Sequence, residues 1–253
     1  MATVLESDKY KLGGSDDRVS TDKGLYPGLY EVGTSLTLIP VDSSDSSLVG
    51  YWKFDEGSGT SAYDASGKGN NGTWNGTGTH YTTGKVGSYA GQFNGSDAYV
   101  NLGGTPSLKP IIVTLSFWAK INSYNTDPTY KPLVGFYYTS GMKSYGIDED
   151  SFRIAVIDSS QKAITFTHKS LGEWHYYTIT YDKQNLIGYI DGVQTGAPVA
   201  STLSLGYGGY LYAGKLYDTY PTGPPLNGLV DDIRVYNRAL SAAEVLALYN
   251  ATK

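Results

Sequence analysis

From residue 48 to about residue 240 the sequence is a succession of short apolar segments separated by turn residues, with no helical periodicity between them. In residues 113–121, VTLSFWAKI, apolar and other side chains alternate as they do in a strand with one buried face. The Asn94-Gly95 and Asp191-Gly192 pairs are typical of tight hairpin turns. This regular spacing of strands and turns predicts an all-β sandwich or jelly roll. The alternation places four side chains on the core face of residues 113–121: Leu115, Phe117, Ala119 and Ile121.

One helix is expected, at the C-terminal end of the chain. Ser241 and Glu244 have the spacing of a capping box, with Ser241 as the N-cap. A helix this short is not stable alone in water, so it has to pack on the sandwich. The apolar stripe that would dock there is Val245, Leu246, Leu248 and Tyr249.

The first 47 residues differ in texture from the rest. They are polar and rich in turn residues, and DSSDSS at residues 42–47 is typical of a linker. Residues 30–39 are the one stretch there that favours a strand or a hairpin arm. We therefore predict an accessory segment at residues 1–47 and a single β domain at residues 48–253.

Composition argues against several classes of partner and excludes sites that need cysteine. The formal net charge is −5, with only 19 Lys and Arg, which disfavours nucleic acid and anionic membranes as partners. No apolar run approaches the ~18 residues of a spanning helix, so we expect no membrane insertion. The absence of Cys excludes disulfides and thiolate metal sites.

The last predicted strand contains a carboxylate that needs a partner. Leu229, Ile233 and Val235 alternate as one buried face, and Asp231 falls on the same face. A lone buried carboxylate is costly, so something positive should meet it. In sandwiches the first and last strands often pair antiparallel, and such pairing would bring Glu56 close to Asp231.

Two carboxylates in a corner of low dielectric repel each other unless a cation lies between them. The loop that follows Glu56 offers further oxygen ligands in Asp64, Asn70 and Asn71. Ligands of oxygen alone suit Ca²⁺ and not Zn²⁺. We therefore predict a structural calcium ion held by Glu56, Asp64, Asn70, Asn71 and Asp231. Two alternatives stay open: the carboxylate caps a turn, or it pairs with Arg234 or Lys68.

Four stretches carry a family resemblance: YWKFDEGSGTSAYDASGKGNNG, LSFWAKI, GEWHYYTITYD followed by LIGYIDG, and LNGLVDDIRVYNRALSAAEVLALYN. In this order they resemble the laminin-G-like domains of the concanavalin A-like lectin/glucanase superfamily, from residue 48 to the C-terminus. The resemblance implies a jelly-roll sandwich of two antiparallel sheets, often with a calcium ion near the first and last strands. The functions it implies are carbohydrate binding, adhesion, or an accessory role beside enzymes.

The leading segment carries a second resemblance. TVLESDKYKL and PGLYEVGTSLTLIP are similar to the stretch after the N-terminal helix of some bacterial type IV pilin-like proteins. That resemblance implies a pilus subunit with a lectin-like head, and hence pilus subunits as partners and a location at the cell surface.

Catalysis is not expected. Residues 146–150, GIDED, are the candidate for a glycosidase pair, since Asp148 and Asp150 could lie on one face of a strand. No further carboxylate motif surrounds them, and with Glu149 they are predicted to form a solvated turn.

A binding site for sugar should present aromatic faces beside a few polar groups. Tyr217, Asp218 and Tyr220 lie in a loop rich in Pro and Gly, and Tyr137, Tyr138 and Tyr145 form a second cluster. We therefore expect an extracellular or bacterial cell-surface module that binds a glycan or a cell-surface protein. The alternative is a structural or protein-binding subunit that binds no glycan.

Overall fold

The computed structural model describes residues 29–30, 39–40, 45–124, 132–137, 143–155, 161–205, 209–215 and 225–253. The chain divides into two compact units, Met1–Asp45 and Ser46–Lys253. In the first unit, β1 (Leu29–Tyr30) pairs antiparallel with β2 (Ile39–Pro40), so the expected strand or hairpin arm is a pair of short strands. The second unit begins close to Leu48, the predicted start of the β domain. That residues 48–253 form an independent domain stays a prediction.

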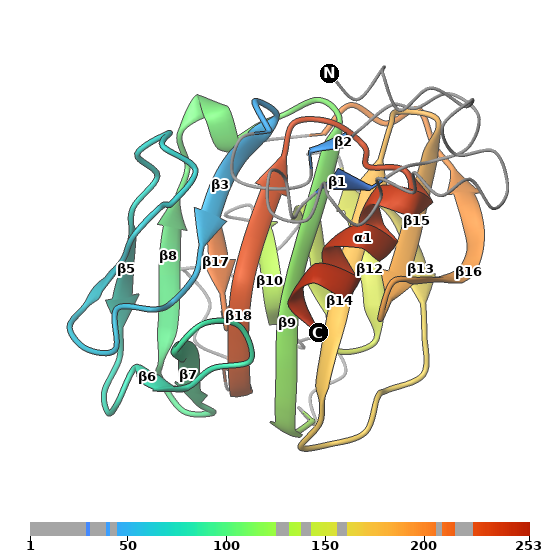
Figure 1. Ribbon diagram of the computed structural model, residues 1–253. Helices are drawn as coiled ribbons and strands as arrows, with labels where there is room; N and C mark the ends of the chain where they lie inside the picture. Colours follow the sequence, from blue (N-terminus) through green and yellow to red (C-terminus); the bar gives the residue numbers. More distant parts are fainter. Residues whose placement is uncertain are drawn as a thin grey trace, which may run out of the picture. The chain divides into compact units, whose positions relative to one another are not determined.

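The second unit is a sandwich of two antiparallel sheets, as predicted (Figure 1). Sheet 1 has eight strands in the order β13-β12-β11-β10-β17-β8-β5-β4. Its strands are β4 (Ser61–Ala62), β5 (Gly72–Asn75), β8 (Tyr99–Gly103), β10 (Pro132–Tyr137), β11 (Lys143–Asp148), β12 (Ser151–Ala155), β13 (Gln161–Thr165) and β17 (Tyr210–Ala213).

Sheet 2 also has eight strands, in the order β16-β15-β14-β9-β18-β7-β6, with β3 paired to β18. Its strands are β3 (Leu48–Trp52), β6 (Tyr81–Thr83), β7 (Tyr89–Asn94), β9 (Val113–Ser123), β14 (Trp174–Tyr181), β15 (Asn185–Ile190), β16 (Val193–Ala200) and β18 (Asn227–Tyr236). The first and last strands of the unit, β3 and β18, pair antiparallel with Trp52 opposite Ile233, which confirms that prediction. A short 3-10 helix, Pro106–Leu108, precedes β9.

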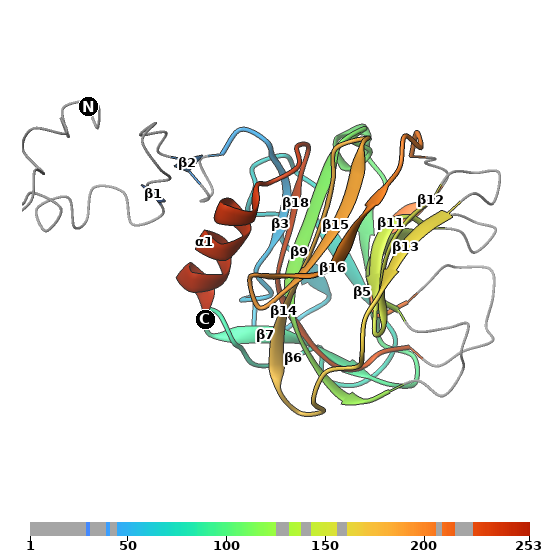
Figure 2. The ribbon, with the colours of Figure 1, turned by 90° about the vertical axis from the view of Figure 1, so that its right-hand side faces the viewer.

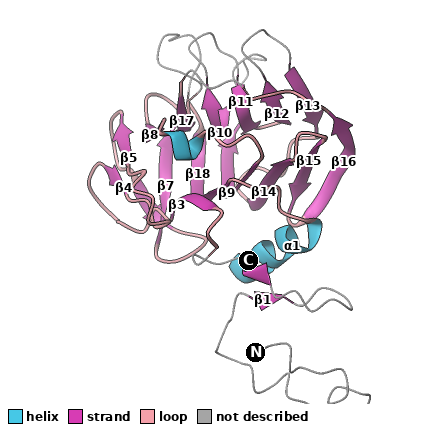
Figure 3. Ribbon diagram, turned by 90° about the horizontal axis from the view of Figure 1, so that it is seen from above, coloured by secondary structure: helices cyan, strands magenta, loops and turns pink. Residues whose placement is uncertain are grey.

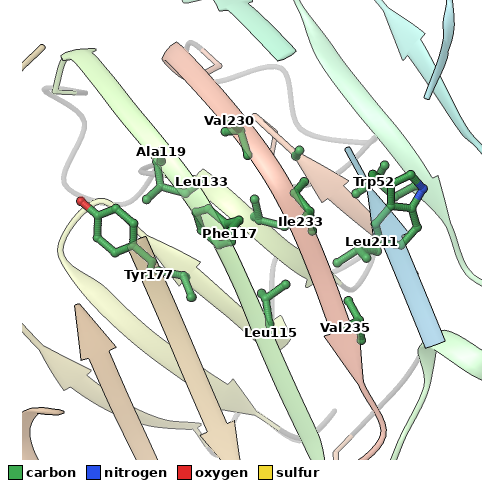
Figure 4. Close-up of a cluster of buried hydrophobic side chains, with 14 of the residues drawn as sticks. Trp52, Leu115, Phe117, Ala119, Leu133, Tyr177, Leu211, Val230, Ile233 and Val235 are labelled. Atoms are coloured by element: carbon green, nitrogen blue, oxygen red, sulfur yellow. The ribbon is translucent and has the colours of Figure 1, made fainter. Parts of the chain in front are cut away.

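The core lies between the two sheets and is made from the inward positions of both (Figure 4). The alternation predicted for β9 is confirmed, because Leu115, Phe117, Ala119 and Ile121 all belong to this core. At one point the sheets approach so closely that only glycine fits. A Cβ added at Gly188 of β15 would lie 2.1 Å from the ring of Phe152 in β12.

The phase of β18 changes at Asp231-Asp232, contrary to the simple alternation. Asp232 has a φ of 55°, and the register against β9 shifts between Asp231 and Arg234. This β-bulge inserts one extra residue, so Val230 and Ile233 both point into the core. Asp231 therefore lies on the outer face of sheet 2, opposite Trp118, and the prediction that it shares a face with Ile233 and Val235 is wrong.

The C-terminal helix α1 (Ala242–Thr252) covers the outer face of sheet 2 (Figure 2). The predicted capping box is present: Ser241 N donates to Glu244 Oε2 at 2.7 Å, and Glu244 N donates to Ser241 Oγ. Trp118 Nε1 of β9 donates to Thr252 Oγ1 at 2.9 Å. Val245 and Leu248 are buried as expected, whereas Leu246 is exposed. No helix in the described part of the chain is long and apolar enough to cross a membrane.

Strand β16 forms one edge of sheet 2 and is irregular (Figure 3). Its pairing with β15 shifts register, Gly196 has a φ of 75°, and Pro198 follows two residues later. Pro lacks the N–H that a further strand would need, so this edge is poorly suited to strand addition.

Candidate functional site

The segment Asp55-Glu56-Gly57 follows β3 and organises the corner where calcium is predicted. Oε1 of Glu56 accepts a hydrogen bond from the backbone N–H of Tyr63 at 2.7 Å. Oε2 of Glu56 is buried and has no hydrogen-bond partner among the described residues. Asp55 Oδ1 accepts the backbone N–H groups of Ser88 and Tyr89, at 2.7 and 3.0 Å. Both carboxylates thus hold neighbouring backbone in place.

Asp64 also acts as a backbone acceptor. Its Oδ1 accepts the N–H groups of Tyr51 and Ser66, both at 2.9 Å, and its Oδ2 accepts that of Asn70 at 2.8 Å. The Asp64 carboxylate therefore ties the loop that it begins to strand β3. Asn71 completes this turn, because its Oδ1 accepts the N–H of Asp64 at 2.9 Å.

The side chain of Asn70 is buried and bonded through both its ends. Nδ2 donates to the carbonyl of Val49 at 2.8 Å and to Ser107 Oγ at 3.0 Å. Oδ1 accepts the hydroxyl of Thr105. A side-chain amide held in this way connects the loop to β3 and to the 3-10 helix.

Asp231 reaches a different loop. Its Oδ2 accepts the backbone N–H groups of Lys85 and Val86, at 2.8 and 2.9 Å. Its Oδ1 is buried without a hydrogen-bond partner in the described part of the chain. Burial raises the pKa of Asp231 to about 7, although the two backbone hydrogen bonds oppose this rise. The open alternative in which the carboxylate caps a turn is the one that the contacts match.

The neighbouring carboxylate makes the ion pair. Arg234 Nη2 lies 3.1 Å from Asp232 Oδ2, and the hydroxyl of Tyr51 donates to Asp232 Oδ1 at 2.7 Å. The guanidinium carbon of Arg234 lies 4.5 Å from the centre of the Tyr51 ring. The pairing with Arg234 that was considered for Asp231 therefore belongs to Asp232, which the bulge turns toward it.

The five predicted calcium ligands do not form one ligand set. Asp64, Asn70 and Asn71 lie at the β3 loop with their oxygens directed at N–H or O–H donors, whereas Asp231 lies at residues 84–86. Across the described ranges no three His, Cys, Asp or Glu side chains are grouped closely enough to hold a metal ion. Only Glu56 and Asp231 keep an oxygen with no described partner. The arrangement does not fit the predicted calcium site, and calcium binding stays a prediction from the sequence.

Two of the three carboxylates in the GIDED stretch are buried and not solvated. Asp148 ends β11 and is 2% exposed, and Glu149 in the following turn is 1% exposed. That part of the prediction is wrong, because the turn is folded against the sandwich. Asp150 lies in the turn and outside β11, so Asp148 and Asp150 do not share one strand.

The tyrosines predicted to bind a ligand divide into two groups. Tyr145 is fully buried, and its hydroxyl donates to the carbonyl of Leu108 at 3.0 Å, so its proposed place on the surface is wrong. It points inward by the alternation of β11. Tyr138, Tyr217, Asp218, Tyr220 and the side chain of Tyr137 lie outside the described residues.

An aromatic surface does occur on the outward side of sheet 1, built by strands β8 and β17. Tyr210 is 47% exposed and lies 6.2 Å, between ring centres, from Tyr212, which is on the same side of the strand but only 1% exposed and lies 6.1 Å from Tyr99. The ammonium of Lys215 lies 4.1 Å from the centre of the Tyr99 ring. We call these four residues, Tyr99, Tyr210, Tyr212 and Lys215, the sheet 1 aromatic face.

Polar side chains extend this face toward the sheet edge. Asn101 of β8 pairs with Tyr212 on one side and with Thr73 of β5 on the other. These residues point outward because Val100 and Leu102, which alternate with Asn101, point into the core. The alternation of β8 and β17 could have identified this surface from the sequence, but the prediction relied on residues outside these strands.

A hollow of about 410 Å³ lies at the other end of the two sheets. Lys162, Gln184 and residues 200–203 line it. Its lining residues in the described part of the chain include neither an aromatic ring nor a carboxylate, so they offer neither a stacking platform for sugar nor an acid pair.

Comparison with protein families gives a match to the concanavalin A-like lectin/glucanases superfamily over residues 94–246. The chain belongs to this superfamily. The match confirms the inferred resemblance over residues 94–246, and with it the fold. Comparison with curated protein sequences gives no significant match. Neither the family match nor the structures described next support the pilin resemblance of the leading segment.

Several solved structures share the fold of this superfamily member. Domain 4 of AbnA, an extracellular GH43 arabinanase of Geobacillus stearothermophilus solved with arabinotriose, is 21% identical, with a TM-score of 0.63; the alignment covers 81% of this chain and 98% of that one. The binding domain of botulinum neurotoxin DC, solved with rat synaptotagmin II, is 15% identical, with a TM-score of 0.64 and coverages of 82% and 52%. A Trypanosoma rangeli sialidase is 15% identical, with a TM-score of 0.62 and coverages of 86% and 34%.

At these identities the similarity concerns the fold alone. The chain spans nearly all of the arabinanase domain, about half of the neurotoxin binding domain and a third of the sialidase. Since the similar structures include a domain solved with a trisaccharide, a binding domain solved with a protein and part of an enzyme, the function has to be argued from the surface of this chain.

Proposed function

We propose that this chain is a non-catalytic carbohydrate-binding module that works outside the cell or at the bacterial cell surface. The observation that carries the proposal is the sheet 1 aromatic face, where an exposed tyrosine ring stands beside amide, hydroxyl and ammonium groups. An aromatic ring can stack on the apolar C–H face of a sugar, while nearby polar groups bond its hydroxyls. Tyr210 provides the ring, and Asn101, Thr73 and Lys215 provide polar groups on the neighbouring strands.

The proposal without catalysis rests on where the carboxylates lie. A retaining glycosidase needs two carboxylates about 5 Å apart beside the bound sugar. Of the candidate pair, Asp148 is buried and Asp150 lies outside β11, and the carboxylates Asp55, Asp64 and Asp231 each bind backbone N–H groups. Their roles in the fold favour a binding module over a hydrolase.

Arabinotriose is the natural first probe, because domain 4 of AbnA was solved with it and the alignment spans 98% of that domain. Titration calorimetry of the full chain should detect binding, and Tyr210→Ala should weaken it about tenfold or more, as loss of a central aromatic contact does. Val193→Ala, which removes an exposed side chain of β16, should leave the affinity unchanged.

A glycan array broadens the test beyond arabinose. Absence of binding to every glycan would contradict the proposal and favour a structural or protein-binding role. Glycan binding that is unaffected by Tyr210→Ala would keep the function but remove the sheet 1 aromatic face as its site.

A further inference from the structure

Two further exposed tyrosines lie away from the sheet 1 aromatic face: Tyr63 directly follows β4 of sheet 1, and Tyr89 begins β7 of sheet 2. Tyr63 is 60% exposed and Tyr89 is 41% exposed. With Tyr210 they are the large aromatic side chains found exposed among the described residues. Single exposed aromatic residues are common on protein surfaces. Tyr63 and Tyr89 differ from such single residues because the same three-residue segment contacts both of them.

Each residue of Asp55-Glu56-Gly57 supports one of the two tyrosines. Asp55 Oδ1 accepts the backbone N–H of Tyr89 at 3.0 Å, and Glu56 Oε1 accepts that of Tyr63 at 2.7 Å. Gly57 lies under the ring of Tyr89: a Cβ added there would be 2.8 Å from the ring carbon Cε2. The φ of 72° at Gly57 also suits glycine, so this position is fixed both by backbone conformation and by contact with the ring.

The backbone around both rings is tied down on either side. Asp64, which follows Tyr63, accepts three backbone N–H groups, and Tyr89 pairs with Thr83 in the β6–β7 hairpin. Exposed rings on a fixed backbone lose little conformational freedom when a ligand binds. The two tyrosine rings therefore stay exposed to water on a fixed backbone, although burial of either ring would have stabilised the fold.

The charges at this corner restrict the ligand. Asp55 and Glu56 place two carboxylates at the base of the rings, and their negative charge repels anions. Ser58 and Ser88, both exposed, add hydroxyls on either side. Aromatic faces combined with carboxylates and exposed hydroxyls suit an uncharged sugar better than an acidic one.

We propose that Tyr63 and Tyr89, held by Asp55-Glu56-Gly57, form a second binding site for neutral saccharides, separate from the sheet 1 aromatic face. In this site Glu56 is a positioning residue that fixes Tyr63. The inference does not depend on the function of the first site, since its residues come from the loop after β3, the position after β4 and the start of β7.

The test is a titration of the ¹⁵N-labelled full chain with arabinotriose, cellotriose and maltotriose, followed by amide NMR shifts. At least one of these sugars should shift the amides of Gly57, Tyr63 and Tyr89 with a single dissociation constant. The double variant Tyr63→Ala/Tyr89→Ala should raise that constant at least tenfold, which corresponds to about 1.4 kcal/mol. Shifts near Tyr99 and Tyr210 should be unchanged in this variant, and Val193→Ala should affect neither set.

Two further variants separate positioning from a general effect on the fold. Glu56→Gln keeps an oxygen to accept the Tyr63 N–H and should retain affinity within about twofold, whereas Glu56→Ala should weaken binding severalfold. Tri-galacturonate should bind this corner at least tenfold more weakly than the best neutral sugar; equal binding would contradict the neutral class of ligand.

The outcomes distinguish the two proposed sites. Shifts at the corner without shifts near Tyr210 would support the second site and overturn the first. Shifts near Tyr210 alone, or corner shifts that survive Tyr63→Ala/Tyr89→Ala, would overturn the second site. No shift at either place with any of the three sugars would overturn it as well.

Discussion

Arg234 and Asp232 form a buried ion pair on the outer face of sheet 2, with Nη2 and Oδ2 3.1 Å apart and exposures of 8% and 1%. The Tyr51 hydroxyl donates to Asp232 and accepts from Arg234, at 2.7 and 2.9 Å. The carboxylate is thus neutralised by a residue two positions along the same strand. This is possible because the bulge at Asp232 lets both side chains emerge on one side.

Arg234→Met should lower the free energy of unfolding by about 3–5 kcal/mol, because it leaves Asp232 buried without its counter-charge. Urea unfolding followed by tryptophan fluorescence measures this directly. Addition of Asp232→Asn to that variant should recover part of the loss, since no unpaired charge then remains. A loss below about 1 kcal/mol for Arg234→Met would mean that water reaches the pair.

Stability should decrease as the pH rises from about 4 to 7, through the contribution of Asp231. Burial places the pKa of the folded state near 7, above the ordinary value of 3.8, so the folded protein binds the extra proton in this interval. Ionisation of the folded state therefore costs stability, up to about 4 kcal/mol at pH 8.

Asp231→Asn should remove this dependence on pH, because the amide oxygen still accepts from Lys85 and Val86 and no charge forms. Thermal unfolding of both proteins between pH 4 and 8 provides the measurement. Equal slopes for parent and variant would show that Asp231 stays ionised throughout, as it would beside a bound cation.

Calcium gives an independent test of the same carboxylate. Because the predicted ligands do not form one set, we expect millimolar Ca²⁺ to leave the melting temperature unchanged relative to EDTA. A site occupied at a hundredfold excess over Kd would instead add about 2.7 kcal/mol. A rise of several degrees that disappears in Asp231→Asn would restore the calcium site predicted from the sequence.

Gly188→Ala should destabilise the sandwich by about 1–3 kcal/mol or more, because its new methyl group meets the Phe152 ring at 2.1 Å. Phe152→Leu in the same chain should recover part of that loss. A double-mutant cycle by urea unfolding measures the coupling between the two sites. Simple additivity would mean that the sheets separate to admit the methyl group without involving Phe152.

The sequence was sufficient for the fold because the period of two in strands such as β9 follows directly from the geometry of a strand. The capping box at Ser241 was equally local, since both of its partners lie within four residues. The corner was harder to predict. The bulge at Asp232 reverses which later residues of the strand point inward, and no residue type in LVDDIRV indicates a bulge at that position.

The site depended on long-range partners. The backbone N–H groups of Tyr63 and Tyr89 are accepted by Glu56 and Asp55. The sequence alone does not distinguish an Asp or Glu that accepts distant backbone N–H groups from one that binds calcium. Tyr145 and Tyr210 show a similar limit. Both belong to strands, and only the direction of each strand relative to the core decides that one is buried and the other exposed.

The irregular edge of β16 affects how copies of this chain associate at high local concentration. A long, regular edge strand offers its free backbone groups to any second copy, and chains displayed side by side would then merge into continuous sheets. Pro198 and the left-handed Gly196 interrupt the row of donors on this side. Copies crowded on a surface or joined in tandem can therefore stay separate along this edge, and each copy keeps Tyr63, Tyr89 and Tyr210 exposed to solvent.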